Sequence, residues 1–172
     1  MRSPSFTTNR LFALALALFG LFAMPAAARD LQFAVIAPDQ KEASLRYAAE
    51  LSNSLAAHAH VLDESLVSSA YKSVSPKAPF NMTAAEARNL GAVVGCDFFL
   101  LVRSADQRRS SYAREEYYES YAVVYAVSSR TGRLVDWSLP KFEAAKPGES
   151  AKLLAASIPG KAAELAEKLK NV

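Results

Sequence analysis

Two histidines and two acids lie close together in the stretch HAHVLDE, and all four side chains are of types that bind metals. His58 and His60 are two residues apart, so an extended chain would place them on one face, with Asp63 shortly after them. A protein-bound zinc ion takes three or four protein ligands, and the sequence has no third histidine. We therefore interpret the stretch as a helix end and a short surface strand, and we keep a metal site as the alternative.

Cys96 is the second candidate for chemistry, as a nucleophile, and it is the only cysteine in the chain. It follows the predicted C-terminus of a helix, where the negative end of the helix dipole opposes formation of a thiolate. No histidine lies near it in the sequence to act as a base. We predict a buried, unreactive thiol and no disulfide within the chain.

The common motifs of hydrolases and nucleotide-binding proteins are absent from the sequence. It contains no G-x-S-x-G and no G-x-G-x-x-G. Gly91 and Gly95 in LGAVVG are explained by close helix packing and by a helix C-cap, and the acids of REEYYES by a solvated strand end. We therefore predict that the protein is not an enzyme and has no cofactor. The alternative is a small hydrolase or metal-dependent enzyme that uses His58, His60 and Asp63 or Cys96.

Residues 1–28 have the order of a secretory signal peptide. Arg2 and Arg10 give a basic start without acids, the 13-residue apolar run LFALALALFGLFA follows, and small residues precede Arg29. The run is shorter than the roughly 20 apolar residues that cross a bilayer. We predict cleavage before Arg29 and a bacterial, periplasmic protein that keeps no stable membrane anchor.

The remaining chain, residues 29–172, suits one domain with its own hydrophobic core. Removal of Arg2 and Arg10 lowers the formal net charge from +3 to +1, so the mature chain is not strongly basic. Nucleic acid is therefore not expected as a partner. Because no disulfide can form within the chain, the core alone must stabilise the fold.

Hydrophobic periodicity and capping residues predict a single α/β domain with a mixed sheet of about five strands packed with four helices. Asp39 and Glu42 predict a helix start at Gln40, and Thr83 and Glu86 form a second capping pattern. The expected strands lie in LQFAVIA, HAHVLDE, CDFFLLV, residues 111–129 and LVDWSL. The polar stretch RSADQRRSS, residues 103–111, is predicted to be a loop.

The last predicted helix opens after KPGES and continues almost to the C-terminus. Its apolar side is expected to consist of Leu154, Ile158, Leu165 and Leu169. Pro159 and Gly160 should kink or split this helix. Glu164 and Lys168 are spaced for an ion pair on its outer side.

The run EEYYESYAVVYAV holds four of the seven tyrosines and alternates as a strand does. Tyr121 and Tyr125 lie among alanines and valines, so we predict that they belong to the core. Tyr117 and Tyr118 lie among charges that are costly to bury, which leaves rim packing or a binding surface open. We predict a partner-binding end at the rim of the sheet, formed by Tyr112, Tyr117, Tyr118, Arg108 and Arg109.

Taken in order, FAVIAP, HVLDESLVSSA, EARNLGAVVGCDFFLLVRS and YAVVYAVSSRTGRLVDW resemble an α/β domain of the bacterial envelope, over most of residues 31–140. This domain is shared by the N-terminal domain of the Tol-Pal translocation protein TolB, the curli secretion channel subunit CsgG and the lipoprotein activators of penicillin-binding proteins. The resemblance implies a periplasmic accessory protein that binds other envelope proteins and has no catalytic residues. Unlike the channel and activator groups, this chain has no lipid-bearing cysteine. We assign structural roles to Gly91, Gly95, Asp97, Gly132 and Trp137.

Overall fold

The computed structural model describes residues 31–172, so the predicted signal peptide and its cleavage point lie outside the described residues. The strands of this part are β1 (Gln32–Ile36), β2 (His60–Val61), β3 (Phe98–Ser111), β4 (Arg114–Ser128), β5 (Leu134–Ser138) and β6 (Lys141–Ala144). The helices are α2 (Glu42–Leu55), α3 (Glu64–Val74), α4 (Ala84–Val94), α5 (Glu149–Ala156) and α6 (Ile158–Lys170), with a short 3-10 helix η2 (Pro79–Asn81).

The strands form one mixed sheet in the order β2-β1-β3-β4-β5, and β6 also pairs with β4. β1 is parallel to β2 and β3, whereas β4 is antiparallel to β3, β5 and β6. The C-terminal helix is split at Ser157 into α5 and α6, as the proline and glycine that follow predicted. The described residues confirm a single α/β domain with a mixed sheet.

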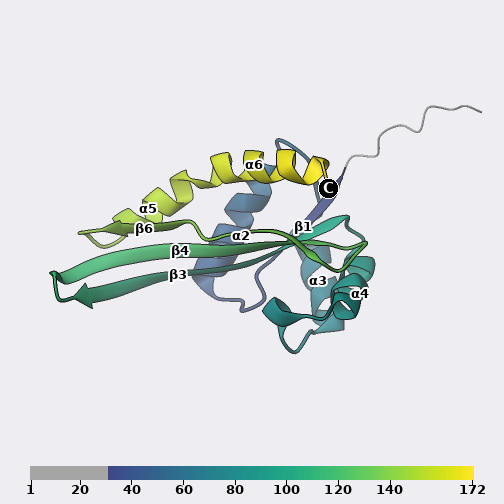
Figure 1. Cartoon of the computed structure of the whole chain (residues 1–172), viewed down its shortest axis with the longest axis horizontal. Helices are drawn as coiled ribbons and strands as arrows, with labels where there is room; N and C mark the ends of the chain where they lie inside the picture. The colour runs from purple at the N-terminus through teal and green to yellow at the C-terminus, as the bar shows by residue number, and fades with distance from the viewer. Residues whose placement is uncertain (1–30) are drawn as a thin grey trace, which may run out of the picture.

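Helices cover the two faces of the sheet unequally (Figure 1). One face is covered by α2, α5 and α6, and its buried core side chains include Phe33, Leu51, Leu100, Val124 and Leu165. The other face is covered by α3 and α4, and its smaller core includes Ile36, Val67, Leu90, Phe99 and Leu101. Figure 1 shows β3 and β4 continuing far beyond α3 and α4. The outer parts of these strands therefore have a helical layer on one side only.

Side-chain caps start both α3 and α4, and the predicted capping pattern of α4 is confirmed. Asp63 accepts hydrogen bonds from the backbone of the first turn of α3. Thr83 and Glu86 form the reciprocal capping box of α4, and Gly95 ends that helix with a left-handed φ of 79°. These local signals fix the position of α4 relative to the strand that follows it.

The predicted start of the first helix is wrong, because α2 begins at Glu42 and not at Gln40. Gln40 has a φ of 51°, and Lys41 occupies the N-cap position without a side-chain hydrogen bond. Asp39 does not cap the helix; its carboxylate lies 3.5 Å from the guanidinium of Arg103 on β3. An ion pair with the sheet has thus replaced the expected capping box.

The predicted loop at residues 103–111 is also wrong, because β3 continues through it to Ser111. Each residue from Arg103 to Arg109 is paired with a residue of β4, and the turn between the strands is Tyr112 and Ala113. The polar composition has a physical reason. This part of β3 lies beyond α3 and α4, so the side of the strand that faces away from the larger core has no helix to pack against and needs no apolar residues. The register of β4 with β5 shifts between Ala126 and Val127, which is a local irregularity in this long strand.

The predicted ion pair between Glu164 and Lys168 does not form. Glu164 instead accepts a hydrogen bond from Lys161 Nζ at 2.6 Å, one turn earlier in α6. Lys168 bonds to Asp136 on β5. The lysine that was assigned to a bond within the helix therefore links α6 to the sheet.

Candidate functional site

The uncovered part of the sheet presents one set of alternating side chains, which we call the open sheet face. Residues opposite one another in antiparallel strands share a face, and Leu101 in the smaller core marks the side of α3 and α4. Outward from Leu101, the open sheet face consists of Arg103, Ala105, Gln107 and Arg109 on β3, Tyr117, Glu119, Tyr121 and Val123 on β4, Trp137 on β5, and Lys141 and Glu143 on β6.

The part of the open sheet face nearest the helices carries aromatic side chains. Tyr121 and Val123 are half-buried, whereas Trp137, to which the sequence assigned a structural role, is 59% exposed. Trp137 is opposite Tyr125, whose ring contacts that of Phe80 in η2 with 5.7 Å between the ring centroids. Aromatic side chains are enriched at protein–protein interfaces. We call this part, formed by Tyr121, Val123, Tyr125 and Trp137, the aromatic strip. It has the composition of a contact surface.

The prediction that Tyr121 belongs to the core is wrong, and for Tyr125 it is right only in part. Tyr121 belongs to neither core cluster, and Tyr125 is a half-buried residue at the margin of the smaller one. The fully buried side of β4 is the opposite one, formed by Ala122, Val124 and Ala126. The prediction assumed that the side of β4 with the larger side chains faces the core. The larger helical layer instead packs on the side with the smaller residues.

An apolar pocket of about 110 Å³ lies beside the aromatic strip. Its lining comes from η2, α4 and the strands, and includes Phe80, Met82, Leu101, Tyr125, Val127 and Leu134. Leu134 is 51% exposed. The pocket adds a small recess to a face that is otherwise the surface of a sheet.

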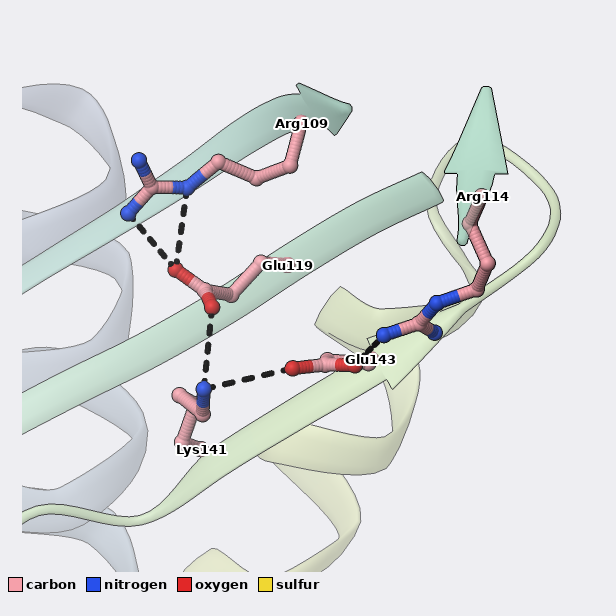
Figure 2. Close-up of polar contacts among 5 residues, drawn as sticks. All are labelled: Arg109, Arg114, Glu119, Lys141 and Glu143. Atoms are coloured by element: carbon pink, nitrogen blue, oxygen red, sulfur yellow. Dashed lines mark hydrogen bonds and ion pairs between the residues drawn. The ribbon is translucent and has the colours of Figure 1, made fainter. Parts of the chain in front are cut away.

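Further out, five charged side chains from three strands form one connected network (Figure 2). Glu119 accepts hydrogen bonds from Arg109 Nη2 at 3.0 Å and from Lys141 Nζ at 3.1 Å. Lys141 Nζ also donates to Glu143 at 3.2 Å, and Glu143 accepts a second bond from Arg114 at 2.5 Å. The network joins β3, β4 and β6, and therefore holds the outer strands in register.

Within this network the carboxylates are more buried than the cations. The side chain of Glu119 is 7% exposed, while those of Arg109 and Lys141 are each 48% exposed. The hydrogen bond from Lys141 is the main cause that lowers the pKa of Glu119, although burial acts in the opposite direction. The bonds from Arg114 and then Lys141 lower the pKa of Glu143. Both carboxylates are ionised at neutral pH, and the groups that face solvent are mainly positive.

Two of the residues predicted to form the binding end, Tyr117 and Arg109, lie on the open sheet face. They are opposite each other on β4 and β3. The guanidinium of Arg114 lies over the ring of Tyr117, 4.1 Å from its centroid, which is a cation–π contact. Tyr117 therefore contacts the charged network on its outer side, with Glu119 between it and Tyr121 along this face of β4.

The other predicted residues lie elsewhere. Tyr118 and Arg108 are opposite each other on the other face of the hairpin, and both bond to Glu116. Tyr112 is fully exposed in the turn. The predicted binding end thus covers two faces and the tip of the hairpin, and its role in binding stays a prediction.

The residues to which we assigned structural roles mostly lie at close contacts between elements. A Cβ on Gly91 would lie 2.4 Å from the Cβ of Ser129, so α4 packs closely on the end of β4. Gly132 has a φ of 69°, and a Cβ there would lie 2.0 Å from a backbone oxygen of α4. The carboxylate of Asp97 accepts the backbone N–H of Gln32 at 2.9 Å. These contacts hold the strands that carry the open sheet face at the end remote from the hairpin turn.

The residues of the alternative enzyme hypothesis are not brought together. His58 and His60 are exposed, and Asp63 caps α3. Across residues 31–172, no three His, Cys, Asp or Glu side chains are placed to hold a metal ion. Cys96 is buried with its Sγ 3.4 Å from Ser129 Oγ, and burial raises the pKa of the thiol to about 11. The predicted burial of Cys96 is confirmed.

Sequence reasoning missed β6 and, with it, the two network residues Lys141 and Glu143. A signal was available, because Lys141 and Glu143 alternate with Phe142 and Ala144 as on a half-buried strand. The stretch is only four residues long and follows Pro140, which made the alternation easy to overlook.

The fold and the site define an α/β domain in which one face of the sheet is only half covered. The described residues contain no helix with the length and apolar character needed to cross a bilayer. No family model matches the chain, and no curated protein matches it either.

Two solved structures have a similar fold. One is the lipoprotein GNA1162 from Neisseria meningitidis, with a TM-score of 0.54 and 14% identity, over 80% of this chain and 99% of that one. The other is a PelC dodecamer from Paraburkholderia phytofirmans, with a TM-score of 0.51 and 13% identity, over 83% of this chain and 92% of that one. At such identities the similarity concerns the fold alone. It agrees with the predicted fold, while the finer resemblance to the Tol-Pal and curli proteins stays a prediction.

Proposed function

We propose that this protein is a non-enzymatic accessory protein of the bacterial envelope that binds another envelope protein through the open sheet face. The observation that carries the proposal is the missing helical layer: β3 and β4 extend beyond α3 and α4 (Figure 1). On this face Trp137 is 59% exposed and Tyr121 is only half-buried. A sheet face with apolar side chains is normally covered by another layer. A partner protein supplies that layer here.

The proposed location is the periplasm, after cleavage of residues 1–28. Its support is the order of a basic start, an apolar run and small residues in the sequence, together with the fold that the chain has in common with a bacterial lipoprotein. The protein acts without a cofactor and without a stable membrane anchor. Its partner is a protein and not a nucleic acid, because the mature chain has a formal net charge of only +1.

Photo-crosslinking in the native bacterium tests this function. A photoreactive amino acid replaces Tyr121 on the open sheet face, and the control positions are Leu153 on α5 and Leu66 on α3, which are both exposed and lie on helices outside this face. We expect a specific adduct with an envelope protein from position 121 and none from the two controls. Equal adducts from all three positions, or none from position 121, would contradict the proposal.

The same experiment separates the predicted binding end into its parts. Position 117 lies on the open sheet face, position 118 on the other face and position 112 in the turn. Adducts from 117 without 118 place the partner on the open sheet face. An adduct between two copies of this chain would favour self-association, which the dodecamer of the similar PelC structure makes the second candidate.

A further inference from the structure

We propose that the partner presents one branched or aromatic apolar side chain flanked by carboxylates, an inference that rests on the proposed function. The apolar side chain occupies the pocket beside the aromatic strip. The carboxylates meet the exposed cations Arg103, Arg109 and Lys141. This assignment names the chemistry of the partner and the part of the open sheet face that it uses.

The pocket has the size and lining for one apolar side chain. Its volume is about 110 Å³, and its lining includes Phe80, Met82, Leu101 and Leu134. For comparison, an apolar cavity of about 150 Å³ binds a benzene molecule. The pocket is therefore an anchor point, and the 59% exposed Trp137 lies next to it, opposite the lining residue Tyr125 in the strand pairing.

The charges around the aromatic strip indicate that the partner is acidic beside its apolar side chain. Arg103 stands on one side, half exposed, with its guanidinium 5.1 Å from the centroid of the Phe80 ring. Arg109 and Lys141 stand on the outer side, and the carboxylate that they share is covered by them. A partner segment that crosses the aromatic strip meets cations at both ends of the strip. Acidic residues on either side of the partner's apolar side chain therefore complement this face.

A protein segment fits this surface better than an anionic polysaccharide or a nucleic acid. Phosphate, sulfate or carboxylate groups of such polymers could meet the cations. The sugars, however, have no branched hydrocarbon group for a pocket lined by Phe80, Met82 and Leu134, and a nucleobase would bring polar edges into this apolar lining. The combination of pocket and cations, and not the cations alone, therefore selects a protein.

The test selects random displayed peptides on the purified exported protein and measures their binding by fluorescence. Trp137 is the only tryptophan in the chain, so its emission reports occupation of the open sheet face directly. Leu134→Asp places a charge at the pocket, and Leu153→Asp is the matched control, since Leu153 is similarly exposed (48% against 51%) on the opposite side of the sheet. Each enriched peptide is compared with a version in which Asn and Gln replace its acids.

We expect enriched peptides to contain Leu, Ile or Phe next to Asp or Glu, and to shift the emission of Trp137 to shorter wavelength. Binding should weaken at least tenfold in Leu134→Asp and stay unchanged in Leu153→Asp. Loss of the acids from the peptide should weaken binding about fivefold, and added salt should weaken it too. Equal binding by the two aspartate variants, or enriched peptides without acids, would overturn the inference.

Heparin, an anionic polysaccharide, distinguishes the other class of ligand. If heparin shifts the emission of Trp137 and the peptides do not, the open sheet face binds an anionic polymer and the inference is wrong. The photo-crosslinking experiment shows separately whether the proposed function holds when this inference fails. A protein adduct from position 121 without acidic–apolar peptide binding would leave an envelope partner of different chemistry, whereas no adduct would remove both.

Discussion

Replacing Glu119 by Gln should loosen the outer strands, because this carboxylate is the central acceptor of the charged network. Its side chain is 7% exposed and takes hydrogen bonds from Arg109 Nε and Nη2 at 3.3 and 3.0 Å and from Lys141 Nζ at 3.1 Å. Gln keeps the volume but loses the charge, and only one of its two terminal atoms, the carbonyl oxygen, can still accept a hydrogen bond, because the NH2 group donates. Hydrogen bonds to charged groups contribute more than neutral ones, but both cations are half exposed to water, so we expect a loss of about 1–2 kcal/mol.

The pH dependence of this loss follows from the lowered pKa of Glu119. A carboxylate whose pKa is lower in the folded state stabilises the protein above its unfolded pKa, and this stabilisation disappears as the pH falls through the folded pKa. The difference in stability between the native protein and Glu119→Gln should therefore be largest at neutral pH. It should shrink as the pH falls below about 4, the ordinary range of a glutamate.

Urea unfolding of the two proteins across this pH range measures the effect. Glu115→Gln is the control, since Glu115 is an exposed glutamate on the same strand, and its replacement should change stability by less than about 0.5 kcal/mol. A Glu119→Gln protein as stable as the native one at neutral pH, or a difference that does not vary with pH, would refute the role of Glu119 in holding the hairpin.

Three further predictions concern packing, the thiol and processing. Gly91→Ala should destabilise the folded protein by about 1–3 kcal/mol, because its Cβ would lie 2.4 Å from that of Ser129. A Cβ on Gly160 would have no atom within 4 Å, so Gly160→Ala should stabilise the protein by up to about 1 kcal/mol. Equal changes in the free energy of urea unfolding for the two variants would contradict this prediction. Cys96, whose pKa burial raises to about 11, should react with a thiol reagent far more slowly in the native protein than in urea, and equal rates would show it to be accessible. The exported protein should begin at Arg29, and an intact mass that includes residues 1–28 would refute cleavage.

The central part of the fold could be predicted because its signals are local. The capping box of Thr83 and Glu86 and the left-handed turn at Gly95 depend on a few neighbouring residues, and the apolar run after Cys96 has the length of a buried strand. Such signals do not depend on which elements pack together, so they could be read from the sequence alone.

The outer hairpin and its open sheet face could not be predicted in the same way. The polar stretch 103–111 is typical of a loop when the partner strand is unknown, and only its pairing with β4 makes it a strand. The burial of Tyr121 depends on how far α3 and α4 extend over the sheet, which no local pattern contains. The network around Glu119 joins residues of three strands, one of which is only four residues long.

Protection of a single engineered cysteine inside the cell tests most directly whether the open sheet face is occupied by a partner. The only natural thiol, Cys96, is buried, so a new cysteine can be labelled against a low background. Gln107→Cys lies on the open sheet face, and Leu153→Cys on α5 is the control. We predict that a maleimide labels Gln107→Cys at least tenfold more slowly in intact cells than in the purified protein, with no such difference for Leu153→Cys. Equal labelling of Gln107→Cys in cells and in the purified protein would contradict the binding surface proposed for this protein.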